Sequence, residues 1–497
     1  MCMGCCQKEN LRRLIYMLLR LSKNTFVRQF GDFTYIISRI ASYDQMFEGG
    51  EVFMRWITRT PMAKEEILKN ICQVYEGTDP AEIAADFEEF LAPLLAGKVI
   101  LAGSTPEELD AQEEYFSYDA DDPKTLEDRE FITKEEADFL PQNVLGKYFE
   151  EHPTLFRLQM DITQACTERC IHCYIPEYNP LFLPFEKIKE IIDEFREMGG
   201  LDLTISGGEC MLHPDFERIV RYAREKDLIV GILSNLTLCD DKIIKLLAET
   251  ESTVQVSLYS MDPAIHDSIT KRPGSHLATK TAIEKLRAAH IPCRISCPTM
   301  KPNFKGYLDV IEYARSLKMS AQTDFIIMGK MDGDCSNLSC RLDLAETREL
   351  LKDIIFKSVP MNSEYFNPAK KNDMLSAEEW MANKVCGAVI DSMCIDAEGN
   401  YYPCPAFGSY ILGNCYKHSL AEVWYNSPET LKLRNVRGKD FPRCAHCPDR
   451  DYCSVCMCRN INETGDIFTP AEHFCRVAAV NHELVDQLQS ERRKYDL

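Results

Sequence analysis

From residue 155 onward, short apolar stretches alternate with amphipathic stretches of helical period. The apolar stretches have the length of β-strands. They cover residues 155–163, 201–208, 228–235, 253–260, 293–300 and 323–329. The amphipathic stretches between them cover residues 184–198, 214–227, 240–250, 275–290 and 307–318. Six strand–helix units predict an α/β fold over 155–355, with a parallel sheet and right-handed crossovers.

The first hundred residues follow a different pattern. Residues 26–46 predict short strands with turns at Gly31-Asp32 and near Ser42. Three helical patterns follow, and two of them begin after a proline, which favours the start of a helix. A final apolar stretch predicts one more strand. These elements cover residues 49–57, 62–75, 79–98 and 98–103. Together they predict a small winged-helix-like unit over 26–104.

Four further segments complete the chain. Residues 1–25 carry an apolar patch broken by arginines, which predicts a short amphipathic helix, and they lack the pattern of a signal peptide. Residues 105–154 are rich in Asp, Glu and Tyr and read as an acidic linker. Residues 356–385 bridge to a domain over 386–497, in which the strand–helix alternation stops and cysteines dominate.

Composition excludes several classes of function. The chain has 497 residues, with 57 basic and 78 acidic side chains and a formal net charge of −21. This acidic balance argues against a nucleic-acid partner. No apolar run is long enough to predict a membrane span. The 23 cysteines are clustered, which in a chain without a secretion signal favours metal binding over disulfides.

Three of these cysteines lie within eight positions, directly after the first strand of the alternating region. Cys166, Cys170 and Cys173 have the spacing C-x3-C-x2-C. A closed structural zinc site needs four protein ligands, whereas three thiolates suit an iron–sulfur cluster with one open iron. Zinc with a catalytic water is the alternative. His172 lies inside the loop and needs no ligand role.

Polar and glycine residues gather at the ends of the next strands. The second strand ends in Gly207-Gly208-Glu209, the third in Ser234-Asn235, and the fourth includes Ser257. Sites in parallel sheets collect at the carboxyl ends of the strands, so these residues are expected beside the cysteine loop.

The last domain carries two cysteine patterns. One is Cys386-x12-Gly399-x4-Cys404. The other has two C-x2-C pairs and later single cysteines: Cys444, Cys447, Cys453, Cys456, Cys458 and Cys475. Paired C-x2-C is also a zinc-ribbon spacing, so zinc stays open here on spacing alone.

The cysteine loop followed one strand later by Gly207-Gly208-Glu209 resembles the radical S-adenosylmethionine (SAM) superfamily. The resemblance implies a partial (β/α)6 barrel in which Cys166, Cys170 and Cys173 hold a [4Fe–4S] cluster whose open iron binds SAM. It implies that Glu209 meets the methionine ammonium of SAM, and that Ser234, Asn235 and Ser257 are candidate SAM contacts. The implied chemistry is reductive cleavage of SAM to a 5′-deoxyadenosyl radical, which removes hydrogen from a substrate.

The C-terminal cysteines resemble the SPASM extension of that superfamily, which carries two auxiliary [4Fe–4S] clusters. By this resemblance one cluster uses Cys444, Cys447, Cys453 and Cys475. The other uses Cys386, Cys404 and Cys456 and lacks a fourth ligand, which Cys394, Cys415 or Cys458 could supply. The family usually has C-x3-C where this chain has Cys453-x2-Cys456. An open iron could hold a substrate thiolate, whereas a closed cluster would favour an electron conduit.

Residues 26–103 resemble a RiPP recognition element, where RiPP denotes a ribosomally made and post-translationally modified peptide. Such elements add a leader peptide as a strand at a sheet edge, and the strand 32–38 is the candidate edge. The resemblances together imply a cytoplasmic peptide maturase of an anaerobic bacterium, with flavodoxin or ferredoxin as electron donor. We expect a cross-linked product, most readily a Cys thioether.

Three alternatives stay open. A carbon–carbon cross-link or an epimerisation would keep the peptide substrate. A sulfatase-type Cys or Ser oxidation, or a small-molecule reaction, would keep the radical chemistry. A non-catalytic iron–sulfur or zinc protein would cleave no SAM.

Overall fold

The computed structural model describes residues 17–40, 43–75, 77–118, 140–358 and 375–495. They fall into two compact units, Met1–Phe116 with Glu136–Lys147, and Ser117–Glu135 with Tyr148–Leu497. Residues 1–16 of the N-terminal segment and residues 119–139 of the acidic linker lie outside the described residues.

The first unit contains two small sheets and a set of helices. One sheet has the order β5-β1-β6 and the other β2-β3-β4. The strands are β1 (Leu18–Leu21), β2 (Thr25–Phe30), β3 (Phe33–Ser38), β4 (Tyr43–Glu48), β5 (Met62–Ala63) and β6 (Ile100–Gly103). The helices are α2 (Glu51–Met54), α3 (Lys64–Val74), α4 (Pro80–Ala96) and α5 (Pro106–Asp110). α7 (Pro141–Glu151) begins in this unit.

Two predictions for this unit are wrong. Residues 18–21 form a strand rather than the end of an amphipathic helix, because β1 pairs with both β5 and β6 and buries Leu19 and Leu21 in the core. The strand predicted as an edge is β3, which pairs with β2 on one side and β4 on the other. The described edges of that sheet are therefore β2 and β4.

The second unit is built on one mixed sheet of order β12-β11-β10-β9-β8-β7-β13-β14-β15. All pairs from β12 to β13 are parallel, and β13, β14 and β15 pair antiparallel. The bounds are β7 (Arg157–Asp161), β8 (Asp202–Ser206), β9 (Ile229–Ser234), β10 (Thr253–Ser257), β11 (Cys293–Pro298), β12 (Ser320–Asp324), β13 (Ser392–Ile395), β14 (Asn400–Tyr402) and β15 (Gly413–Asn414). The cysteine-rich segment thus extends the sheet of the strand–helix region.

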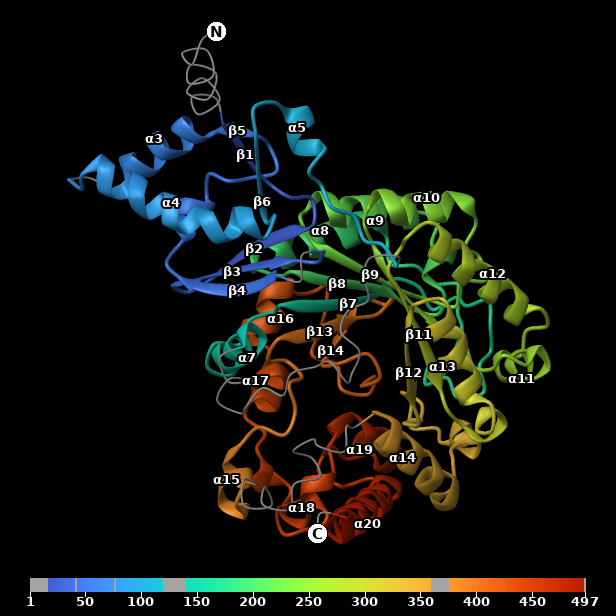
Figure 1. Cartoon of the computed structure of the whole chain (residues 1–497). Coiled ribbons are helices and arrows are strands. Elements are labelled where there is room, and N and C mark those ends of the chain that lie inside the picture. Colours follow the sequence, from blue (N-terminus) through green and yellow to red (C-terminus); the bar gives the residue numbers. More distant parts are fainter. Residues whose placement is uncertain (1–16, 41–42, 76, 119–139, 359–374, 496–497) are drawn as a thin grey trace. The chain divides into compact units, whose positions relative to one another are not determined.

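Crossover helices cover the outer face of the strands β7 to β12 (Figure 1). They are α8 (Phe185–Glu197), α9 (Phe216–Glu225), α10 (Asp241–Glu249), α11 (Pro263–Thr270), α12 (Ser275–Ala288) and α13 (Tyr307–Ser316). Alternate strand residues are buried toward the helices, such as Leu158, Leu203 and Val230. The opposite positions of β7, β8 and β10 include Gln159, Thr204 and Gln255. The inner face of these strands therefore carries polar side chains among apolar ones.

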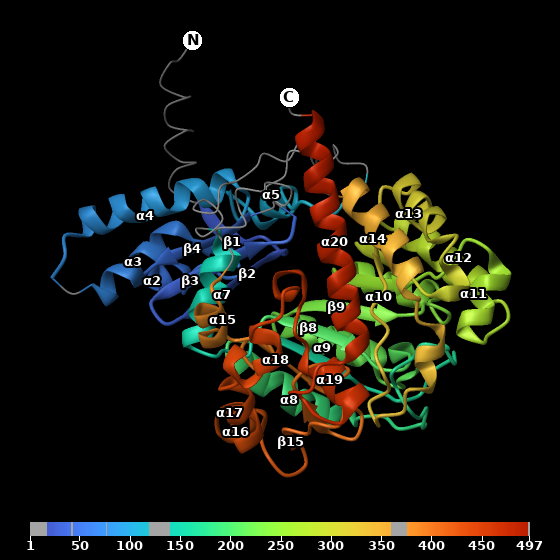
Figure 2. The same ribbon diagram turned by 90° about the horizontal axis from the view of Figure 1, so that it is seen from below.

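Further helices and turns make up the rest of this unit. The helices are α14 (Leu344–Ser358), α15 (Ala377–Ala382), α16 (Leu420–Asn426), α17 (Pro428–Arg434), α18 (Pro442–Ala445), α19 (Met457–Thr464) and α20 (Glu472–Tyr495). Single 3-10 turns span Cys210–Leu212, Lys301–Asn303, Ser336–Cys340, Gly438–Asp440 and Arg450–Tyr452. α20 runs beside α14 (Figure 2), where Leu351, Val477 and Leu484 form a shared apolar cluster. This contact ties the C-terminal segment to the strand–helix region.

Candidate iron–sulfur and S-adenosylmethionine site

The loop after β7 brings the three predicted cysteines together. Burial raises the pKa of Cys166 to about 12, and it also raises the pKa of Cys170 and of Cys173. Cys173 raises the pKa of both other thiols further, so the three sulfurs face a common space. Buried thiols of this kind ionise only when a nearby cation compensates the charge, which is the environment that a cluster provides.

Polar groups of the chain surround these sulfurs. The Glu168 N–H points at the Cys166 sulfur at 3.4 Å, and the Cys166 thiol donates to the Gly208 carbonyl at 3.2 Å. The Tyr259 hydroxyl donates to the Cys170 sulfur at 3.8 Å. Hydrogen bonds to ligand sulfurs tune the potential of a bound cluster.

The Gly207-Gly208-Glu209 segment lies directly against the cysteine loop. The Gly208 N–H donates to the Thr163 carbonyl at 2.9 Å, and the Glu209 N–H donates to the Ala165 carbonyl at 2.8 Å. A Cβ on Gly207 would lie 2.3 Å from the Thr163 oxygen, and one on Gly208 would lie 2.3 Å from the Ala165 oxygen. Gly207 also has a φ of +128°. Only glycine permits this approach of two backbones.

The Glu209 side chain is held by the chain itself. Its carboxylate accepts from the Met211 N–H at 3.0 Å, the Asn235 N–H at 2.9 Å and the Ser234 hydroxyl at 2.9 Å. Burial raises the pKa of Glu209, and these donors act in the opposite direction. Glu209 therefore joins the end of β8 to the end of β9, and contact with a SAM ammonium stays a prediction.

The remaining residues at the strand ends lie beside the cysteine loop. Asn235 donates from Nδ2 to the Thr167 hydroxyl at 3.0 Å and approaches the Cys166 sulfur at 3.9 Å. Ser257 ends β10 near Tyr259, whose hydroxyl contacts it. His172 is buried with its ring edge on Tyr259 at 5.2 Å, and burial lowers its pKa to about 4. It is a neutral packing residue in this structure.

The residues present fit a cluster and SAM. The three thiols lie near Glu168, whose Oε1 is buried without a hydrogen-bond partner among the described residues. This oxygen could accept a hydrogen bond from a bound ligand. Within the same described residues, no three His, Cys, Asp or Glu side chains gather closely enough for a single metal ion. A cluster separates its thiolates because each binds a different iron.

The four cysteines of the first auxiliary set lie near one another. Burial raises the pKa of Cys444 to about 11, and Cys475, Cys453 and Cys447 raise it further. Cys475 and Cys447 also raise the pKa of Cys453. The four thiols therefore share one site between α18, the turn Arg450–Tyr452 and the start of α20.

The second set assembles as well. Burial raises the pKa of Cys386 to about 11, with smaller contributions from Cys404 and Cys456. Cys456 precedes α19, and a hydrogen bond with Cys458 lowers its pKa. The three predicted thiols lie together.

A cavity of about 330 Å³ occupies the inside of the barrel at the starts of the strands. Its wall includes Gln159, Thr204 and Thr253 from three strands and Cys404 from the second auxiliary set. The sequence analysis did not predict these polar groups in the cavity wall. The available signal was the alternation of polar and apolar residues along each strand.

Asp161 is a further residue that sequence reasoning missed. It ends β7, accepts from Gln159 Nε2 at 2.8 Å, and burial raises its pKa to about 6. Tyr174, directly after Cys173, has its pKa raised by burial and then by Asp161 and the neighbouring thiols, including Cys404.

Two family models match the chain. One, described as the Radical SAM superfamily, matches residues 160–302, and the SPASM model, described as an iron–sulfur cluster-binding domain, matches residues 386–448. An AdoMet-dependent heme synthase of Methanosarcina barkeri is 26% identical over 335 residues, covering 63% of this chain and 94% of the relative. The antilisterial bacteriocin subtilosin biosynthesis protein AlbA of Bacillus subtilis is 27% identical over 326 residues, covering 63% and 69%.

Solved structures show the same fold. Streptococcus suis SuiB bound to its precursor peptide SuiA superposes with a TM-score of 0.55 at 17% identity, covering 90% of this chain and 97% of SuiB. Native anSMEcpe with bound AdoMet and Kp18Cys peptide superposes with a TM-score of 0.51 at 14% identity, covering 69% of this chain and 100% of anSMEcpe. No helix within the described ranges is long and apolar enough to cross a membrane.

Radical SAM domains bind SAM and a [4Fe–4S] cluster, and SPASM domains bind auxiliary iron–sulfur clusters. The match over 160–302 covers the cysteine loop and the Gly207-Gly208-Glu209 segment, and the match over 386–448 covers the start of both auxiliary sets. The chain therefore carries a radical SAM domain followed by a SPASM domain, and it is an iron–sulfur enzyme that uses SAM.

Proposed function

We propose that this enzyme matures a ribosomally made precursor peptide by removing hydrogen and joining two residues in a cross-link. The observation that carries the proposal is the cavity inside the barrel, whose largely apolar wall also carries a few polar side chains and reaches Cys404. A peptide backbone brings N–H and C=O groups that need partners when they leave water, and Gln159, Thr204 and Thr253 offer them. A wholly apolar wall would suit such a substrate poorly.

The names of relatives support a peptide substrate. Besides AlbA, they include a PqqA peptide cyclase of Streptomyces rochei and the mycofactocin maturase MftC of Mycobacterium ulcerans. SuiB was solved with its precursor peptide. Heme synthases among the relatives make a small-molecule reaction the competing proposal.

Each part of the chain has a task in this proposal. Cys166, Cys170 and Cys173 would hold the SAM-binding cluster, and the two C-terminal sets would hold two auxiliary clusters. When bound, the SAM-binding cluster and SAM supply a 5′-deoxyadenosyl radical that takes a hydrogen atom. The Gly207-Gly208-Glu209 segment fixes the cysteine loop, and the barrel wall orients the peptide and limits water.

Cross-link formation removes two hydrogens from the peptide. One would leave as an atom to the 5′-deoxyadenosyl radical, and the other would leave as a proton while its electron passes to an auxiliary cluster. Asp161, at the end of β7, is our candidate acceptor for that proton. A Cys thioether is the product we test first, with a carbon–carbon bond second, and the single starting electron comes from a donor such as flavodoxin or ferredoxin.

The first unit is the proposed leader-binding module. Its β2-β3-β4 sheet has β2 and β4 as described edges, and strand addition at an edge is a common way to bind an extended peptide. If the substrate is a peptide with a leader, removal of residues 1–116 should abolish its modification while slow SAM cleavage continues. Full turnover without residues 1–116 would favour a small-molecule substrate.

The direct test uses a short Cys-containing peptide encoded beside this gene. We expect anaerobic enzyme, SAM and reductant to change the peptide mass by a loss of about two hydrogens per bond. Alkylation of free thiols then separates a thioether, which blocks one cysteine, from a carbon–carbon bond. The Cys166→Ala variant is the control without radical chemistry. SAM turnover with an unchanged peptide mass would contradict cross-linking.

A further inference from the structure

The start of α19 places an additional thiol beside the second auxiliary set. Cys458 is 4% exposed, and its thiol lies close enough to Cys404 and Cys456 for both to raise its pKa. Its sulfur also lies 3.9 Å from the sulfur of Met328. Cys386 completes the neighbourhood, since it interacts with Cys404 and Cys456.

Backbone conformation explains how Cys456 and Cys458 can serve one site. Residues two apart on a helix point to different faces. Cys456, however, precedes the helix with φ −133° and ψ 108°, which is extended backbone, and Cys458 is already in the first turn. The change of conformation between them lets both sulfurs turn to the same side.

The other two candidates are placed less well. Cys415 lies against Gly399, where an added Cβ would be 2.5 Å from its sulfur, and its charged neighbours include Lys187 and Asp396. Cys394 is in β13, and Asp161 raises its pKa more than Cys404 does. Neither has a hydrogen-bond contact with a thiol of the second set among the contacts of the described residues.

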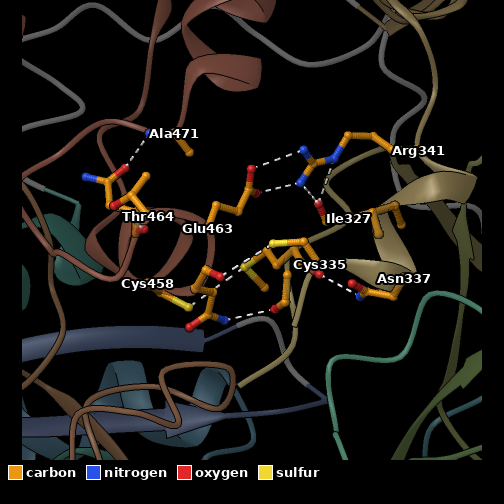
Figure 3. Close-up of polar contacts among 12 residues, drawn as sticks. Ile327, Cys335, Asn337, Arg341, Cys458, Glu463, Thr464 and Ala471 are labelled. Carbon is orange, nitrogen blue, oxygen red and sulfur yellow. Dashed lines mark hydrogen bonds and ion pairs between the residues drawn. The ribbon is translucent and has the colours of Figure 1, made fainter. Parts of the chain in front are cut away.

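Buried hydrogen bonds hold Cys458 in position. Asn462, one turn later on α19, donates to the Gly329 carbonyl at 3.0 Å and to the Ala406 carbonyl at 2.9 Å. Ala406 is two residues from Cys404, so Asn462 fixes the two cysteine segments against each other. Arg341 forms an ion pair with Glu463 at 2.6 Å and also donates to the Ile327 carbonyl (Figure 3).

We propose that Cys458 is the fourth ligand of the second auxiliary cluster, together with Cys386, Cys404 and Cys456. The cluster is then closed and has no open iron for a substrate thiolate. It serves electron transfer, and any thioether forms without attachment of the peptide sulfur to this cluster. The ligand assignment rests on the SPASM domain, while its consequence for the product rests on the proposed function.

The test counts iron and probes open iron positions in the full chain. In a parent variant with Cys166, Cys170 and Cys173 all changed to Ala, the remaining iron belongs to the auxiliary clusters, about four atoms each. We expect cyanide to leave its electron paramagnetic resonance spectrum unchanged. Adding Cys458→Ala should make one cluster cyanide-responsive or remove about four irons, whereas Cys394→Ala and Cys415→Ala should behave as the parent.

Two outcomes would overturn the assignment. One is a parent that already binds cyanide, and the other is a Cys458→Ala variant with full iron and an unchanged, cyanide-insensitive spectrum. A Cys458→Ser variant keeps an oxygen ligand, so retained iron with a shifted spectrum separates ligation from misfolding. The spectrum of the first auxiliary cluster reports local folding. None of these measurements needs a peptide, so they stand apart from the test of the proposed function.

Discussion

The Ser234 hydroxyl lies 2.9 Å from both carboxylate oxygens of Glu209 and joins the ends of two neighbouring strands. Two backbone N–H groups, of Met211 and Asn235, complete the set of donors. A buried carboxylate with these donors is stable only while the donors remain.

Glu209→Gln should therefore weaken the chain and the SAM site together. The amide NH2 of glutamine would face N–H donors, so we expect a loss of about 1–3 kcal/mol in the free energy of unfolding. We also expect weaker SAM binding by equilibrium dialysis. Glu186→Gln, at an exposed position of α8, is the matched control. An unchanged stability with lost SAM binding would mean that Glu209 acts on SAM directly.

Gly208→Ala tests the contact between two backbones. Its Cβ would lie 2.3 Å from the Ala165 oxygen, so the cysteine loop must shift. We expect a loss of about 1–3 kcal/mol and a lower iron content. Gly231→Ala in β9 is the control, because its Cβ would have its nearest neighbour at 3.7 Å. Equal iron in both variants would contradict a special role for Gly208.

The sequence predicts the alternating strands well, because each has a buried face of β-branched and apolar residues. The sixth strand shows where that reasoning fails. The apolar stretch 323–329 was the predicted strand, but β12 is Ser320–Asp324, an edge strand with exposed alternate residues. Ile327 packs instead with Tyr259 and Met300. Apolar character located burial there but could not distinguish a strand from a packed loop.

The resemblance to the SPASM extension implies both auxiliary cysteine sets, but it leaves the fourth position of the second set open. Cys394, Cys415 and Cys458 are equally good candidates in the sequence. The position of α19 distinguishes them. This position depends on hydrogen bonds from Asn462 to the carbonyls of Gly329 and Ala406, which lie in distant segments of the chain. A contact between segments so far apart in the chain leaves no local sequence signal.

Arg341→Met tests the ion pair that holds α19. Arg341 and Glu463 side chains are 8% and 11% exposed, so removing the arginine leaves a poorly solvated carboxylate. We expect destabilisation of about 3–5 kcal/mol by chemical denaturation. The double variant Arg341→Met with Glu463→Gln should recover much of it. For comparison, Arg315→Met at the exposed pair with Glu312 should cost under about 1 kcal/mol.

The Asp161 carboxyl group should make stability depend on pH. Burial raises its pKa from 3.8 to about 6, while Gln159 and Ser206 act in the opposite direction and Asp396 adds to the rise. Tyr174 and Cys394 are its other titratable neighbours. The folded state then binds more protons than the unfolded state between these two values, so this group lowers stability as pH rises from about 4 to 6.

Asp161→Asn removes that ionisation and should stabilise the chain above pH 6 by on the order of 2 to 3 kcal/mol. The gain should shrink toward about pH 4, where the carboxyl group is neutral in both states. Urea unfolding of both proteins across this range measures the difference, with Asp309→Asn on an exposed turn of α13 as a control. A gain that does not change with pH would mean that the Asp161 carboxyl group is already solvated. In the proposed reaction the same variant should still cleave SAM but form less cross-link, because the candidate proton acceptor is gone.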